Sequence, residues 1–164
     1  MGMIVMGRTS MKVTNMMKTI KHYQQPTGNT CGPTCIYMVH KHLNDYQGSI
    51  GDIAKLCTTD WVVGTPPDKM ILGLDGLDIK YIHHVEPNEP FDLLNNIISK
   101  GNITMLRTLT QGIPHWIIVN DYDGKIYNVL DPWLGEIVYN HKDLDYVWSG
   151  RNYECFEIIT NENN

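Results

Sequence analysis

Four residues, far apart in the chain, have the types that a cysteine-nucleophile site requires. Gln25 precedes Cys31 by six positions, and His115 and Asp131 come much later. A thiol is a strong nucleophile only after it loses its proton, and a free pKa near ~8.5 leaves a few per cent ionised at neutral pH. A helix N-terminus and a neighbouring imidazolium both favour the thiolate. The four types therefore predict acyl transfer on Cys31, with His115 as the base and Asp131 orienting it.

The segment after Cys31 has the pattern of a helix that would carry the thiol at its N-terminus. Pro33 suits a first helical turn, where its missing N–H costs nothing. The apolar positions, which recur at three- and four-residue spacing, are Cys35, Ile36, Val39 and Leu43. Gly32 would let the backbone approach a substrate closely. We expect the Gln25 amide to fold back and form an oxyanion hole with the Cys31 N–H, a donor whose loss typically costs about 100- to 1000-fold in rate.

A second segment has the pattern of a β-hairpin. Residues 115–121 are apolar almost throughout, which is typical of a strand covered on both faces. Asp123-Gly124 is a two-residue turn signal, so the chain should return antiparallel. His115 begins the first strand and Asp131 ends the second, which places both at one end of the sheet. The hairpin thus predicts a base and its orienting carboxylate as neighbours.

The rest of the chain predicts helices first and a sheet second. Further helices are expected after caps at Ser49, Thr65 and Asn88. The remaining segments expected as strands are residues 78–84, 103–109, 136–139 and 153–159, with a helical turn at 143–148. This order indicates an α+β domain. We expect residues 19–160 to form that single domain, and we interpret residues 1–18 as a disordered or added leader.

These motifs resemble the papain-like peptidases that process bacteriocin leaders after a double glycine, and their stand-alone relatives. The family pattern is a Gln, a Cys-Gly-Pro-x-Cys segment, a His before an apolar strand, and an Asp-Pro pair. The matching positions are Gln25, residues 31–35, residues 115–119 and Asp131-Pro132. The resemblance implies an α+β, papain-like fold in which an N-terminal helix carrying the nucleophile packs on a C-terminal antiparallel sheet. It also implies hydrolysis of a peptide or amide bond without a metal or organic cofactor.

The resemblance leaves the substrate open. No transporter region accompanies the domain within these 164 residues, so leader processing coupled to export is not implied. The leading expectation is a peptide or protein substrate with small residues before the cut. A deamidase or acyl transferase would share the acyl-enzyme on Cys31 and is an alternative. A peptide-binding module that does not cleave is a second alternative, and the four intact residue types count against it.

Other residues that could carry chemistry have simpler interpretations. Cys31 and Cys35 have three residues between them on one helix, whereas zinc knuckles normally use two-residue spacing in a tight turn. Cys57 and Cys155 have the sequence contexts of core thiols. No metal site is therefore predicted. The histidines interpreted as simply solvated are His22, His40, His42 and His141, and no role follows for His83 or His84.

Two tryptophans are candidates for substrate contacts. Trp116 directly follows the expected base, and we expect it to cover the imidazole. Trp61 lies in a stretch with glycine and proline, residues 58–67, that could form a cleft wall. Core packing or a surface anchor is the competing interpretation for each.

Composition sets the outer limits. With 164 residues, 42% of them hydrophobic, the chain can bury the core of one domain. A formal net charge of −5 without a Lys/Arg cluster argues against nucleic-acid or membrane-surface binding. No segment has the apolar length of a transmembrane helix, and the N-terminus is not a convincing signal peptide. We therefore expect a cytoplasmic protein of bacterial or phage type, whose oligomeric state the sequence leaves unknown.

Overall fold

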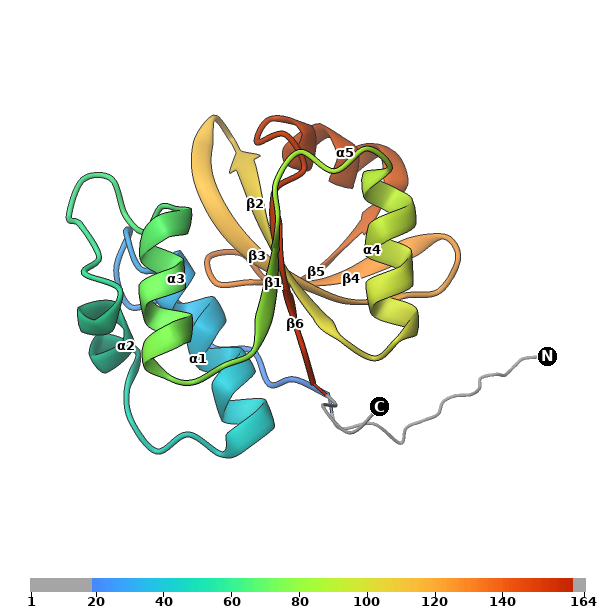
Figure 1. Ribbon diagram of the computed structural model, residues 1–164. Coiled ribbons are helices and arrows are strands. Elements are labelled where there is room, and N and C mark those ends of the chain that lie inside the picture. The colour runs from blue at the N-terminus through green and yellow to red at the C-terminus, as the bar shows by residue number, and fades with distance from the viewer. Residues whose placement is uncertain (1–18, 161–164) are drawn as a thin grey trace.

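The computed structural model describes residues 19–160, so the interpreted leader at 1–18 lies outside the described residues. Helices cover both faces of one six-stranded antiparallel sheet (Figure 1). The helices are α1 (Cys31–Asn44), α2 (Ile50–Leu56), α3 (Pro67–Gly76), α4 (Pro90–Ser99) and α5 (His141–Ser149). The strands are β1 (Tyr81–His84), β2 (Ile103–Thr110), β3 (Ile113–Tyr122), β4 (Ile126–Asp131), β5 (Gly135–Asn140) and β6 (Cys155–Ile158).

The sheet is built around the predicted hairpin. Its strand order is β1-β6-β2-β3-β4-β5, so β6, the last strand in sequence, lies between β1 and β2. Strands β3 and β4 pair antiparallel in the register Ile118↔Leu130 and Val119↔Val129. On the other side of β3, Thr108 of β2 pairs with His115. The register places the start of β3 and the end of β4 at the same end of the sheet, as expected.

Alternate residues of β3 enter two separate hydrophobic cores. Trp116 and Ile118 belong to the core shared with α1, α2 and α3. Ile117 and Val119 belong to the core shared with α4 and α5. Figure 1 shows these two groups of helices on opposite sides of the sheet. Burial on both faces explains why residues 116–119 are apolar without interruption.

Side-chain caps begin two of the described helices, α2 and α5. Helices α3 and α4 instead begin after Pro66 and Glu89, without the caps expected at Thr65 and Asn88. The capping box expected at the start of α2 is present, because Ser49 Oγ accepts from Asp52 N and Asp52 Oδ2 accepts from Ser49 N. Asn140 caps α5 by accepting from Asp143 N. On α4 the fully buried residues are Leu94 and Ile97. None of the described helices is long and apolar enough to cross a membrane.

Several boundaries differ from the sequence prediction. The helical turn expected at 143–148 is the longer helix α5, and the strand expected at 153–159 is shortened to Cys155–Ile158. The strand expected at 78–84 begins only at Tyr81, because Ile79 N donates to Leu74 O and closes the C-terminal end of α3. In the hairpin turn, the side chain of Asp123 accepts from the N–H groups of Lys125 and Ile126. The turn therefore centres on Gly124 and Lys125, one residue later than the Asp123-Gly124 signal suggested.

Candidate active site

Cys31 is the first residue of α1, at the helix end where backbone N–H groups lack helical acceptors. The N-cap residue, Thr30, makes no side-chain bond to the helix, because its hydroxyl donates to Thr27 O at 3.1 Å. The positive end of the helix therefore remains uncapped beside the thiol. Negative charge that develops on the sulfur would face the positive end of the helix dipole.

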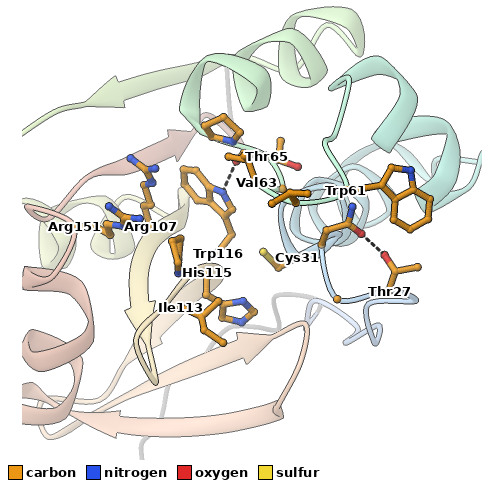
Figure 2. A pocket seen from close by; sticks show the side chains of 16 residues that line it. Thr27, Cys31, Trp61, Val63, Thr65, Arg107, Ile113, His115, Trp116 and Arg151 are labelled. Atoms are coloured by element: carbon orange, nitrogen blue, oxygen red, sulfur yellow. Dashed lines mark hydrogen bonds between the residues drawn. The ribbon is translucent and has the colours of Figure 1, made fainter.

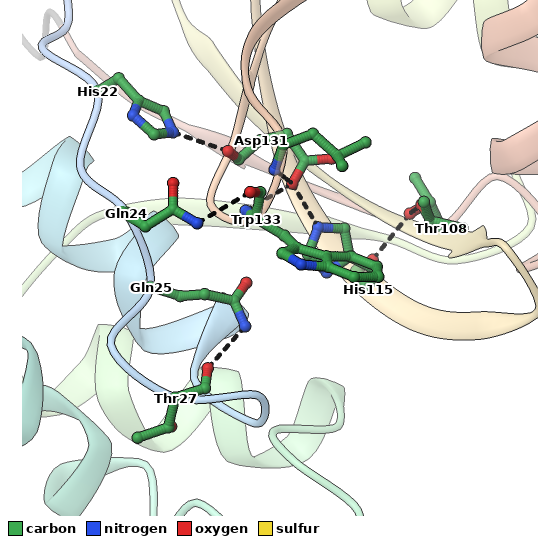
Figure 3. Close-up of polar contacts among 10 residues, drawn as sticks. His22, Gln24, Gln25, Thr27, Thr108, His115, Asp131 and Trp133 are labelled. Atoms are coloured by element: carbon green, nitrogen blue, oxygen red, sulfur yellow. Dashed lines mark hydrogen bonds and ion pairs between the residues drawn. The ribbon is translucent and has the colours of Figure 1, made fainter.

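His115 and Asp131 form a close pair at the end of the hairpin. Nε2 of His115 lies 2.7 Å from Oδ1 of Asp131, across sixteen residues of sequence (Figure 3). The histidine is 5% exposed and the aspartate is fully buried. The Thr108 hydroxyl donates to the carbonyl of His115 at 3.0 Å, which fixes the backbone at this point. These two side chains are thus close together in the structure, as the hairpin predicts.

The imidazole also interacts with the thiol of Cys31. Burial by itself would lower the pKa of His115, but the hydrogen bond to Asp131 and the contact with Cys31 outweigh it and raise this pKa to about 9. Because Nε2 faces Asp131, the other ring nitrogen, Nδ1, is the one available to Cys31. Figure 2 shows Cys31 and His115 in the same cleft. An imidazole held between a carboxylate and a thiol has the arrangement of a general base with its orienting group.

A tight turn holds Asp131 in its charged form. Oδ1 accepts from the backbone N–H of Trp133 at 2.7 Å and from that of Leu134 at 3.0 Å. Burial raises the pKa of Asp131, but the bonds from His115 and from these two N–H groups hold it below its usual range. The carboxylate can therefore orient His115 and stabilise its positive charge without taking its proton.

The segment before α1 runs alongside this turn and places Gln25. The Gln25 N–H donates to Pro132 O at 2.8 Å, and the Gln24 side chain donates to Trp133 O at 2.9 Å (Figure 3). The Gln25 amide donates one N–H to Thr27 O at 2.7 Å. Gln25 is not among the residues that line the cleft, and its Oε1 is buried without a hydrogen-bond partner, so its part in an oxyanion hole stays a prediction.

The interpretation of His22, a residue of this segment, as simply solvated is wrong. His22 is half-buried, and its Nε2 hydrogen-bonds the carbonyl of Asp131 at 2.7 Å, so it is not simply solvated. Nothing in the polar sequence around His22 indicates this contact, because it joins residues 109 positions apart. The contact ties the chain before Gln25 to the end of β4.

Two residues that the sequence suggested for the substrate side of the site, Gly32 and Trp116, have other roles in the structure. A Cβ on Gly32 would lie 2.7 Å from Met70 Sδ and 3.0 Å from Thr65 Cβ, so packing alone requires glycine there. Gly32 is buried and is not among the residues that line the cleft. Trp116 does not cover the imidazole. The ring that lies edge-on to His115, at 6.2 Å between centroids, is that of Trp133.

The cleft that contains Cys31 and His115 has a volume of about 390 Å³. Trp116 forms part of it, with its indole N–H donating to Thr65 O at 2.8 Å (Figure 2). Trp61 lines the opposite wall and is 85% exposed. The Asn29 amide donates to Asp60 O at 2.8 Å and anchors the start of the loop that carries Trp61. The predicted cleft wall at residues 58–67 is therefore present, and residues 61–66 line it.

The other three cysteines lie outside the cleft and are buried. Burial raises the pKa of Cys57 and that of Cys155 to about 12. Burial, followed by the charges of Cys31 and Asp131, raises the pKa of Cys35 well above its usual value. These three thiols are protonated at neutral pH and unreactive. Among the described residues no group of three or more His, Cys, Asp or Glu side chains could hold a metal ion.

Two arginines in the cleft were not singled out by sequence reasoning. Arg107 of β2 and Arg151 of the turn after α5 both line it, on the same side of Trp116 in Figure 2. Neither lies in a motif, and only the pairing of distant segments brings them to the cleft. No local signal in the sequence could have identified them.

Comparisons with known proteins agree with this architecture. The peptidase domain of Streptococcus ComA, described as a bi-functional ABC transporter involved in quorum sensing, has a TM-score of 0.71 and 16% identity over 87% of this chain and 100% of that one. A double-glycine-motif protease from an AMS/PCAT transporter, solved with its leader peptide, has a TM-score of 0.68 and 14% identity over 86% and 93%. A putative C39-like peptidase from Bacillus anthracis has a TM-score of 0.68 and 11% identity over 87% and 95%.

These likenesses confirm the α+β, papain-like fold predicted from the sequence. A search of curated protein sequences gives no match. The sequence profile of the Peptidase C39 family matches residues 19–155. Since this match covers most of the chain, the protein belongs to the Peptidase C39 family and is a cysteine-type peptidase.

Proposed function

We propose that this peptidase hydrolyses a peptide or isopeptide bond through an acyl-enzyme on Cys31. The observation that carries the proposal is the position of the His115 imidazole, which is bonded to Asp131 at 2.7 Å and contacts the thiol at the N-terminus of α1. No other described cysteine lies in the cleft. In this proposal Cys31 and His115 act from the wall of the cleft, and the buried Asp131 orients His115 from behind.

The reaction follows from these positions. His115 takes the proton of Cys31, and the thiolate attacks the carbonyl carbon of the scissile bond. In this proposal the backbone N–H of Cys31 and, after the Gln25 amide turns away from Thr27, its N–H stabilise the negative charge on the carbonyl oxygen. His115 then gives its proton to the leaving amine, which departs and leaves a thioester. A water molecule, deprotonated by His115, attacks the thioester, releases the carboxylic acid and restores Cys31.

The shape of the cleft supports a substrate with small residues near the scissile bond. Gly64, Thr65 and Pro66 line it next to the nucleophile, and Trp116 is fixed between them and β3. Trp61 offers an exposed ring at the rim for a substrate side chain. The neighbour solved with its leader peptide supports a peptide as the ligand of such a cleft. The cytoplasmic location expected from the sequence stays a prediction.

The test is the pH dependence of iodoacetamide labelling, read at each cysteine by peptide mass spectrometry. At about pH 6, where an ordinary thiol is protonated, Cys31 should be labelled rapidly. Cys35, Cys57 and Cys155 should stay unlabelled in the same sample and serve as internal controls. His115→Ala should shift the labelling of Cys31 towards alkaline pH, because the imidazolium that favours the thiolate is gone.

Two outcomes would replace peptide hydrolysis by one of the alternative functions. If Cys31 reacts no faster than a free thiol at about pH 6, its nucleophilic role is wrong and a peptide-binding module becomes the better account. If Cys31 is activated but the enzyme releases ammonia from a side-chain amide rather than cutting a chain, the enzyme is a deamidase, which shares the first half of the reaction. Mass spectrometry of the products separates these two reactions.

A further inference from the structure

The cleft contains an arginine that has no partner. Arg151 lies in the turn between α5 and β6 and lines the cleft together with Cys31 and His115 (Figure 2). Its Nε is buried without a hydrogen-bond partner, and within residues 19–160 its side chain makes no ion pair. A guanidinium is always charged and carries five N–H donors. Leaving it partly buried and unpaired is unfavourable, unless a ligand supplies the acceptors.

The acidic residue nearest in sequence does not neutralise Arg151. Glu154 accepts from Arg107 Nη1 through Oε1 at 3.1 Å, and its Oε2 bonds His83 Nε2 at 2.7 Å. Both carboxylate oxygens are therefore already in use. Arg107 also lines the cleft, so one of the two arginines there is paired and the other is free. Glu154 thus balances the charge of Arg107, and the unbalanced positive charge in this part of the cleft is that of Arg151.

The charged residues that line the cleft also favour a negatively charged ligand. Although the chain has a net charge of −5, no aspartate or glutamate is among the described residues that line the cleft. A cleft lined by one sign of charge concentrates ligands of the opposite sign. In Figure 2 the two arginines lie on one side of Trp116, and Cys31 and Trp61 lie on the other. The positive charge thus lies in the same cleft as Cys31, on the far side of the Trp116 ring.

The turn that carries Arg151 is held in place before any ligand binds. Tyr153 N donates to Trp148 O at 3.2 Å, and Asn152 N donates to Ser149 O at 3.0 Å. The indole N–H of Trp148 donates to Glu154 O at 3.0 Å. A donor on a fixed turn loses little conformational freedom when it binds a ligand, which favours tight and selective binding.

We propose that Arg151 forms a carboxylate-binding subsite, so that the substrate is a peptide whose acidic group occupies the same cleft as the bond that is cut. This inference rests on the proposed function, since the same cleft holds the reacting groups. A guanidinium binds a carboxylate through two parallel N–H···O bonds. The carboxylate comes from an Asp or Glu side chain or from the free C-terminus of the peptide.

The experiment uses equimolar decapeptides with a central Gly-Gly pair. At each other position one peptide carries Glu and its partner carries Gln, and each is made with a free C-terminal carboxylate and as an amide. Mass spectrometry follows their cleavage by the full chain. At one position the Glu peptide should be cleaved about tenfold faster than its Gln partner, as expected for a charge-assisted pair. A gain restricted to free-acid peptides would identify the C-terminus as the source.

Three variants locate the preference on Arg151. Arg151→Gln should bring the Glu/Gln ratio to about one, and Arg151→Lys, which keeps the charge but not the paired donors, should retain part of it. Lys142→Gln removes the same charge from the exposed surface of α5, outside the cleft, and should leave the ratio and the rates unchanged. Thermal unfolding of each variant shows whether the fold is intact.

Binding separates a failure of this subsite from a failure of the proposed function. The same peptides, labelled with a fluorophore, are titrated with Cys31→Ala, which cannot form an acyl-enzyme. If wild type cleaves peptides with a Glu/Gln ratio near one, the subsite is overturned and the peptidase proposal stands. If nothing is cleaved but Cys31→Ala binds Glu peptides more tightly, and Arg151→Gln removes this difference, the subsite stands without peptidolysis. Equal binding without cleavage overturns the subsite as well.

Discussion

Of the three histidine–carboxylate pairs among the described residues, His115–Asp131 and His84–Glu157 have almost completely buried carboxylates but different surroundings. His115 Nε2 lies 2.7 Å from Asp131 in the cleft, and His84 Nε2 lies 3.0 Å from Glu157 where β1 meets β6. Both carboxylates are almost completely buried. Burial raises the pKa of each carboxyl, but hydrogen bonds, the histidine's first among them, hold it below its usual range. A close histidine–carboxylate pair is therefore not in itself a sign of catalysis.

The difference lies in the other contacts of each pair. Glu157 also bonds Lys100 at 3.0 Å and Asn102 at 2.8 Å, so its charge is balanced by a network that links β6 to the end of α4. Asp131 is held by backbone N–H groups, and its histidine contacts the thiol of Cys31. A second reactive group on the far side of the imidazole, at the wall of a cleft, is what makes one pair a candidate for chemistry.

Removing the histidine from each pair should give the largest difference. His115→Ala should lower kcat/KM by about 1000-fold or more, because the members of a nucleophile–base unit fail together. His84→Ala should change kcat/KM by less than about twofold, because it lies outside the cleft and its loss affects only stability. Steady-state cleavage of one peptide measures both. Equal losses of kcat/KM in two folded variants would mean that the two pairs do not differ in their contribution to catalysis.

Replacing the carboxylate by its amide should come next in size. Asp131→Asn should lower kcat by about 100- to 10,000-fold, because the amide favours the wrong tautomer of His115 and cannot stabilise its charge. Glu157→Gln should leave kcat unchanged and lower the free energy of unfolding by about 1–3 kcal/mol, as for a buried hydrogen-bonded charge. Kinetics and urea unfolding on both variants give the two numbers. A kinetic loss in Glu157→Gln would show that the two pairs are coupled.

The contribution of His115 to the stability of the fold should depend on pH. The pKa of His115 is raised from 6.5 to about 9 in the folded state, so its protonated form stabilises the fold. This contribution is complete below about pH 6.5 and is lost as the pH rises through about 9. The difference in unfolding free energy between wild type and His115→Gln should therefore shrink over that interval. Urea unfolding at a series of pH values tests this, and a difference that stays constant would contradict the raised pKa.

Much of the site was predictable because local patterns determine it. The helix that begins at Cys31 follows from the spacing of its apolar residues and from Pro33. The meeting of His115 and Asp131 follows from an apolar strand, a turn signal and antiparallel return. Each of these features is encoded within about twenty consecutive residues, the size of a hairpin or a helix with its cap.

What could not be predicted depends on contacts between distant segments. Arg151 reaches the cleft because β6 inserts between β1 and β2, an order that no local pattern specifies. Gly32 is required by Met70 and Thr65, which come from other elements of the fold. The error on Trp116 was avoidable in principle. Successive residues of a strand point to opposite faces, so the residue after His115 points away from the imidazole.

The smallest expected effect concerns the ring that lies against the His115–Asp131 pair. Trp133 lies edge-on to His115 and is 43% exposed, whereas among the described residues no aromatic ring packs on His84. Trp133→Ala should lower kcat/KM by about 2- to 10-fold, the range that corresponds to an aromatic contact of about 0.5–1.5 kcal/mol. Trp133→Phe should restore most of this loss.

Cleavage kinetics of the two Trp133 variants, with thermal unfolding as the control for folding, decide how much this ring contributes. Water that reaches the His115–Asp131 bond weakens it, because an electrostatic contact loses strength in a medium of higher dielectric constant. If Trp133→Ala keeps the wild-type kcat/KM, shielding does not distinguish the two histidine–carboxylate pairs. The contact between His115 and Cys31 would then account for the whole difference between them.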